Sequence, residues 1–177
     1  MKLKLMFAVA LAGTAAVYAQ NPFSTEVKGN YEQVKGLVTK AAADMPDDGY
    51  AYVPGPGSRT YGAAVTHIAE VQVALCNMAA GAEGPKIDTA KTSKADAIAA
   101  LKAAFDFCDP IYAGLTDADG AKTVKMFGRD RTKLGVLDFG VIHDNEMYGT
   151  LAVYLRAKNT VPPSTAGRGM MGKKKKE

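Results

Sequence analysis

Residues 143–164 read HDNEMYGTLAVYLRAKNTVPPS, and this stretch restricts the fold more than any other part of the chain. It continues a pattern that begins near residue 133, in which apolar side chains recur every three or four positions, as on one face of a helix. Pro162 and Pro163 end the pattern, because proline cannot donate the backbone hydrogen bond that continues a helix. We therefore predict a helix over residues 133–158, with these residues on its inner face: Leu137, Val141, Tyr148, Leu151 and Leu155.

Three earlier segments have the same periodicity. The first begins at Ser24, the second at Thr60 or two residues earlier, and the third at Ser93, since hydroxyl side chains are favoured at helix starts. Their inner faces are marked by Val27, Tyr31, Val34, Val38 and Ala41 in the first helix, by Tyr61, Val65, Ile68, Gln72, Leu75 and Ala79 in the second, and by Ile98, Leu101, Phe105, Cys108, Tyr112 and Leu115 in the third.

Long connections separate these segments. Residues 46–57 are dense in Pro and Gly, residues 81–92 form a second loop, and residues 116–132 are polar, with TVKMF (123–127) as a candidate short extended piece. Four amphipathic segments without convincing strands predict an all-α four-helix bundle over residues 20–160, with long loops after helices 1, 2 and 3. Residues 161–177, VPPSTAGRGMMGKKKKE, hold too little apolar content to bury and are predicted to be a disordered tail.

The first twenty residues, MKLKLMFAVALAGTAAVYAQ, have the three parts of a secretory signal peptide. Lys2 and Lys4 form the basic region, an apolar stretch follows, and small residues precede a cleavage site after Ala19. The apolar stretch is shorter than the roughly 20 residues needed to span a bilayer. We therefore expect residues 1–19 to be removed and the protein to be exported, to the periplasm or the extracellular space, without a membrane span in the mature chain.

The charge distribution argues against a nucleic-acid partner. The chain carries 22 Lys and Arg against 18 Asp and Glu, a net charge of +4, but the excess lies at its two ends. Residues 20–160 are close to −2, whereas nucleic-acid binding requires Lys and Arg clustered on the folded surface. The expected partner is an unidentified small molecule or protein.

Two segments together resemble the DinB-like (DinB/YfiT-type) superfamily of four-helix bundles. They are YVPGPGSRTYGAAVTHIAEVQ (52–72) and the stretch 143–164, and the resemblance covers about residues 24–164. It implies an up-down-down-up order of helices, and such bundles often pair as homodimers. Many members bind a divalent metal through one histidine on helix 2 and two on helix 4, and some are thiol-dependent transferases or isomerases. On this chain the three positions are His67, His143 and Met147.

Three interpretations of this incomplete triad remain open. In the first, His67 and His143 face one another in a polar niche and no metal is held firmly. In the second, Glu70 or Glu146, each three positions after a histidine, completes a site of two imidazoles and a carboxylate, which suits iron. In the third, Met147 joins the two histidines, a donor set that suits Cu(I).

Two functions follow from these interpretations. The missing third histidine favours a non-catalytic binding or scaffold role with a degenerate metal site, no assigned catalytic residues and no firm cofactor. The alternative is an enzyme of the thiol-transferase kind that uses Zn, Ni or Fe at His67 and His143.

The two cysteines provide a test of the helix order. Cys76 and Cys108 lie at similar distances from the starts of the second and third helices. In the helix order that the resemblance implies, these two helices are parallel and the cysteines lie at matching heights. Two buried free thiols and a disulfide are both compatible with this placement, and an oxidising compartment favours the disulfide.

Overall fold

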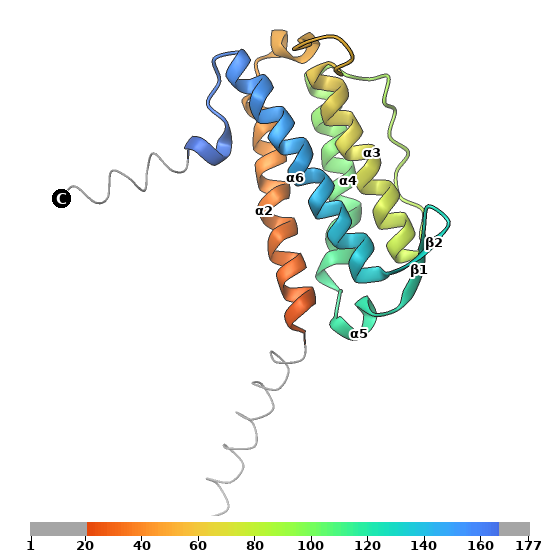
Figure 1. Ribbon diagram of the computed structural model, residues 1–177. Helices are drawn as coiled ribbons and strands as arrows, with labels where there is room; N and C mark the ends of the chain where they lie inside the picture. The colour runs from red at the N-terminus through yellow and green to blue at the C-terminus, as the bar shows by residue number, and fades with distance from the viewer. Residues whose placement is uncertain (1–20, 167–177) are drawn as a thin grey trace, which may run out of the picture.

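A computed structural model describes residues 21–166 as a bundle of four long helices (Figure 1). The expected signal peptide and the Lys-rich run 173–176 lie outside the described residues. The long helices are α2 (Pro22–Asp44), α3 (Tyr61–Ala80), α4 (Lys94–Ala113) and α6 (Lys133–Ala157). The connections contain the 3-10 helix η1 (Asp47–Ala51), the single turn α5 (Asp117–Gly120) and an antiparallel hairpin of β1 (Thr123–Met126) and β2 (Arg129–Thr132). The prediction of an all-α four-helix bundle is confirmed.

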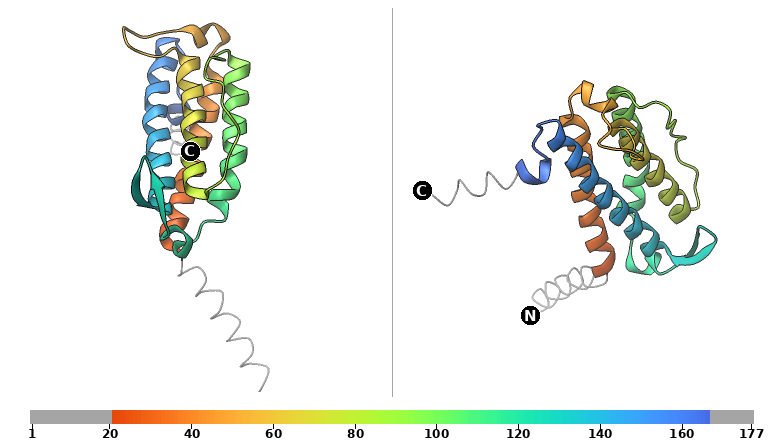
Figure 2. Two further views of the ribbon diagram at one scale, coloured as in Figure 1. Left: turned by 90° about the vertical axis from the view of Figure 1, so that its right-hand side faces the viewer. Right: turned by 45° about the horizontal axis from the view of Figure 1, so that its top comes forward.

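Contacts between helix ends give the direction of each helix. The Lys94 ammonium at the start of α4 donates to the Met45 carbonyl just after α2 (2.8 Å). Lys158, after α6, pairs with Asp48 (2.8 Å). Thus α2 and α6 end where α4 begins. The connection after α3 runs along the outside of α3 and α4 and returns the chain to that end (Figures 1 and 2), so that α3 and α4 are parallel.

The cysteines show that α3 and α4 lie side by side, in agreement with their parallel direction. Cys76 and Cys108 form a disulfide with a Cα–Cα distance of 5.8 Å. Both are completely buried. The predicted disulfide is therefore present, and it joins positions at matching heights on two helices.

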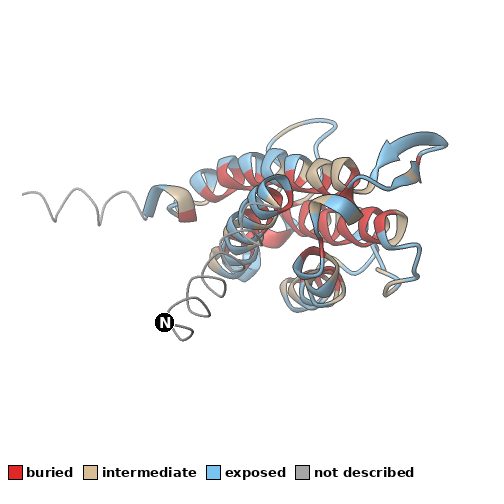
Figure 3. Cartoon of the chain, turned by 90° about the horizontal axis from the view of Figure 1, so that it is seen from below, coloured by how far each residue is buried: buried red, intermediate tan, exposed pale blue. Residues whose placement is uncertain are grey.

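Apolar stripes from all four long helices meet in one core, and the buried residues in Figure 3 line the centre of the bundle. Tyr31 of α2 stacks on Tyr112 of α4, with ring centroids 3.7 Å apart. Among the described helices, α3 alone is long and apolar enough to cross a membrane by length and composition. More than half of its most apolar window is buried inside the bundle, which accounts for this composition.

The start of α2 differs from the sequence prediction. The helix begins at Pro22 with Asn21 as its N-cap, and Ser24 is buried in its first turn. The carboxylate of Asp117 instead accepts the amide hydrogens of Phe23 (3.3 Å) and Ser24 (2.7 Å). This part of the cap comes from one residue more than 90 positions away, and a local pattern cannot reveal such a partner.

The predicted tail also starts too early. Pro162 and Pro163 are buried against the bundle. The amide of Ser164 donates to the Tyr148 hydroxyl (2.8 Å), which itself donates to the Ser164 hydroxyl (2.8 Å). The packed part of the chain thus extends beyond residue 160. Two prolines and one serine make these contacts, and the low average hydrophobicity of residues 161–177 does not reveal them.

Candidate functional site

The structure brings His67 and His143 together. His67 lies in the second turn of α3, a helix whose start is fixed by the Thr60 hydroxyl accepting the Ala63 amide (3.1 Å). His143 lies near the middle of α6. The two rings meet edge to face with their centroids 5.4 Å apart. Their side chains are 25% and 15% exposed, so the pair is partly open to solvent.

His143 has a carboxylate partner that sequence reasoning did not identify. Its Nδ1 lies 3.1 Å from Oδ1 of Asp144, a residue that is only 2% exposed. Burial raises the pKa of the Asp144 carboxyl, and the hydrogen bond with His143 opposes this. An ionised carboxylate can only accept a hydrogen bond. When Asp144 is ionised, Nδ1 of His143 therefore carries a proton, and in the neutral imidazole the Nε2 lone pair is available.

His67 is held in a different electrostatic environment. Its Nδ1 lies 3.6 Å from Oε2 of Glu70, an ion-pair distance when the imidazole is protonated. Burial lowers the pKa of His67 most, repulsion from Arg59 and from a protonated His143 lowers it further, and Glu70 opposes them. The net effect is a pKa below the ordinary value, which favours the neutral form of His67 beside the second imidazole.

The third position of the triad supplies no strong metal donor. Met147 is partly buried, one turn after His143 on the same helix. Glu146 is exposed. Over residues 21–166, no three side chains of His, Cys, Asp or Glu come together as metal ligands do. The residues present do not fit a three-histidine metal site, and the carboxylate-completed site gains no support from this arrangement.

Asp144 could have been found from the sequence. It lies on the apolar stripe of α6 between Val141 and Tyr148, both of which are buried. A carboxylate on such a stripe must find a partner or change its protonation state, because burying an unpaired charge is costly. The adjacent histidine is the nearest candidate partner in the sequence.

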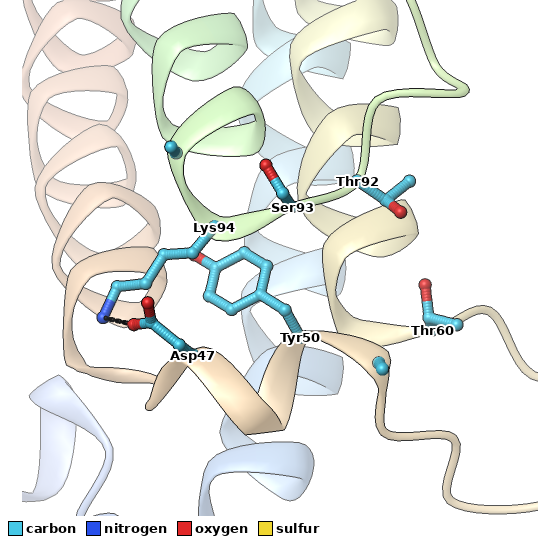
Figure 4. A pocket seen from close by; sticks show the side chains of 8 residues that line it. Asp47, Tyr50, Thr60, Thr92, Ser93 and Lys94 are labelled. Atoms are coloured by element: carbon cyan, nitrogen blue, oxygen red, sulfur yellow. Dashed lines mark ion pairs between the residues drawn. The ribbon is translucent and has the colours of Figure 1, made fainter.

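A separate cavity of about 450 Å³ opens where α3 and α4 begin (Figure 4). Its polar wall includes the hydroxyl-bearing residues Thr60, Thr92 and Ser93, and the Lys94 ammonium, which pairs with Asp47 (3.3 Å). Neither His67 nor His143 lines this cavity or the three smaller ones that the structure describes. The histidine pair and this cavity are thus two distinct places on the molecule.

Comparisons with known proteins agree with this architecture. The family description "DinB superfamily" matches residues 30–151. A DinB-like protein from Bacillus cereus ATCC 10987 has a similar structure, with a TM-score of 0.67, 18% identity, and coverage of 77% of this chain and 93% of that one. The DinB-like protein YjoA from Bacillus subtilis has a TM-score of 0.63, 20% identity and the same coverage of both chains. A search of curated proteins found no match. The family match covers more than half of the sequence, and the chain belongs to the DinB superfamily.

Proposed function

We propose that this protein is an exported, non-catalytic binding member of the DinB superfamily whose metal site has degenerated. The observation that carries the proposal is the donor set at the histidine pair, where Met147 occupies the third position. A thioether is a soft, neutral ligand, whereas Zn and Ni prefer imidazole or thiolate. The pair of imidazoles is retained, but the donor that would close a tight divalent site is absent from that position.

The buried disulfide supports export. Disulfides form and persist in oxidising compartments and are rare in the cytosol, where thiols are kept reduced. The pairing of Cys76 with Cys108 across two helices thus suits a protein that leaves the cytosol, as the pattern of residues 1–19 also indicates. Low-molecular-weight thiol cosubstrates belong mainly to the cytosol, which weakens the proposal of a thiol transferase.

The cavity at the start of α3 and α4 supports a binding role. Small-molecule pockets commonly have volumes of roughly 300–1,000 Å³, with a few polar groups that orient the ligand. The cavity of about 450 Å³ lies in this range and combines hydroxyl groups with Lys94 and Asp47. A small polar molecule is therefore the proposed class of ligand.

A metal-dependent enzyme using His67 and His143 is the alternative. It is favoured by the carboxylates beside both rings, because a metal-bound histidine commonly donates the N–H of its second ring nitrogen to a carboxylate. Metal analysis of protein purified from its native compartment separates the two functions. Stoichiometric Zn, Ni, Fe or Cu that is lost in His67→Gln would overturn our proposal, whereas metal below stoichiometry after incubation with each ion supports it.

Restoring the third histidine provides a direct test of the degenerate site. Met147→His should create a divalent metal site, because it places three imidazoles on the facing sides of α3 and α6. At about 100-fold excess of Zn over the dissociation constant, the variant should gain about 2.7 kcal/mol of stability, seen as a raised melting temperature. The control is Met78→His, a partly buried methionine three turns along α3 from His67. A variant with no metal-dependent shift, or one that only equals the control, would show that the three positions do not converge.

A further inference from the structure

The β1–β2 hairpin concentrates positive charge on an otherwise acidic body. Its residues 123–132, TVKMFGRDRT, contain three Lys and Arg and one Asp, a net charge of +2, whereas the rest of residues 20–160 carries −4. Lys125 pairs with Asp130 across the strands (2.6 Å). Arg129 and Arg131 are exposed, and in the part of the chain that the structure describes their side chains make no ion pair or hydrogen bond. Two guanidinium groups are therefore available to an anionic partner.

The apex of the hairpin carries an exposed aromatic ring. Phe127 is 69% exposed, more than any other large apolar side chain of the described residues. Its φ of 49° lies in the left-handed region, where Asn or Gly is usual in a two-residue hairpin turn. Gly128, with φ 80°, is the expected residue at the second turn position. Neither core packing nor turn geometry explains the aromatic side chain of Phe127 at the first turn position.

The hairpin is anchored close to its turn, by the residue that precedes Phe127. Met126 is buried against the core, and Arg129 is its cross-strand partner. Figures 1 and 3 show the hairpin projecting beside the C-terminal end of α3 and the start of α6, with its surface mostly exposed. The ring of Phe127 and the side chains of Arg129 and Arg131 are thus exposed on a short element that is anchored through Met126.

We propose that this hairpin docks the protein onto an anionic phospholipid surface. Phe127 would enter the headgroup region, where an aromatic ring gains from partial burial, and Arg129 and Arg131 would bind lipid phosphates, whose geometry guanidinium matches. The positive hairpin is complementary to an anionic surface, which would repel the acidic remainder of the body. A stable protein interface buries about 800 Å² on each partner, which two arginines and one ring cannot supply. The inference is independent of the proposed function at the histidine pair.

A single tryptophan can report insertion, because the chain contains no Trp. The mature chain carrying Phe127→Trp is mixed with vesicles of phosphatidylglycerol or of phosphatidylcholine. The emission should shift to the blue with phosphatidylglycerol vesicles alone. The control is Val153→Trp, at an exposed apolar position on α6 (57% exposed). An absent shift, an equal shift with phosphatidylcholine, or an equal shift at position 153 would overturn the proposal.

A charge variant tests the role of the arginines. In a vesicle sedimentation assay, Arg129→Gln with Arg131→Gln should weaken binding roughly 30-fold, because each basic residue near an anionic membrane contributes about a factor of five. The matched control removes two exposed cations from the α3–α4 connection, with Lys86→Gln and Lys91→Gln. An equal loss of vesicle binding in the two double variants would overturn the proposal. It would show that binding depends on the overall charge of the protein, including that of the Lys-rich tail, and not on the hairpin. Tighter binding to DNA or to an acidic peptide than to phosphatidylglycerol at the same salt would also overturn it.

Discussion

The protonation of His67 is set by neighbours that act in opposite directions. Burial disfavours the charged imidazole most, and Arg59 and His143 disfavour it by repulsion, while Glu70 attracts it. The pKa of His67 therefore lies below the ordinary value of 6.5. The unfolded chain then binds this proton more readily than the folded protein. The stability contributed by neutral His67 is present above pH 6.5 and is lost as the pH falls through the folded pKa.

Substitution of the two neighbours should move this pKa in opposite directions. His143→Gln removes the repulsion from a second ionisable ring and should raise the pKa of His67 toward 6.5, whereas Glu70→Gln removes the attracting carboxylate and should lower it further. Titration of the ring protons by NMR measures both shifts, and the chain's two histidines are readily assigned from single variants. Shifts of the same sign in both variants would show that the two rings and Glu70 are not arranged as described.

Individual residues of the site differ in how far the sequence could predict them. His67 and His143 were identified from the resemblance, and a pairing of facing helices brings them together. Helical spacing indicates Glu70 and Glu146 as the carboxylates beside the two histidines, whereas the carboxylate that contacts His143 is its direct neighbour Asp144. Spacing along a helix indicates a shared face, but burial decides which carboxylate an imidazole meets.

The start of α3 packs closely against the chain before α4, and a glycine makes this possible. A Cβ built on Gly62 would collide with the backbone carbonyl oxygen of Thr92, which cannot move aside as a flexible side chain can. By contrast, Gly36 is exposed within α2 and has no atom near the place of a Cβ. The same substitution should thus have opposite effects at the two sites.

We expect Gly62→Ala to lower the free energy of unfolding by about 1–3 kcal/mol, because overpacking forces the backbone to shift. Gly36→Ala should raise it by about 0.5–1 kcal/mol, because alanine loses less conformational freedom in a helix than glycine does. Urea unfolding followed by circular dichroism measures both changes. If Gly62→Ala were as stable as Gly36→Ala, the close approach of α3 to Thr92 would be refuted.

Element boundaries followed local chemistry where the chain caps its own helices. Thr60, Ser93 and Thr132 each accept an amide hydrogen three residues later, so the starts of α3, α4 and α6 lie where hydroxyl residues precede an amphipathic pattern. The start of α2 was misplaced because Asp117 supplies part of its cap from another element. The hairpin was seen only as one extended piece, since β2 is exposed throughout and has no alternation of apolar residues.

Because of the disulfide, the stability of the whole molecule depends on whether its surroundings are oxidising or reducing. It joins positions 32 residues apart on two parallel helices, so it restricts the unfolded chain across the long return connection. In the chain-entropy account such a crosslink contributes about 2–4 kcal/mol to stability. The completely buried position of both cysteines protects the bond from reductants while the bundle is folded.

Reduction should therefore lower the free energy of unfolding of the mature protein by about 2–4 kcal/mol. Urea unfolding with and without a thiol reductant measures this difference, and the double variant Cys76→Ala with Cys108→Ala should not respond to the reductant.

Protein from the native host should have the intact mass of a chain that starts at Gln20, less the mass of two hydrogen atoms, because export and oxidation occur together. A chain that retains Met1 and two free thiols would contradict both the expected export and the role of the disulfide in the native protein.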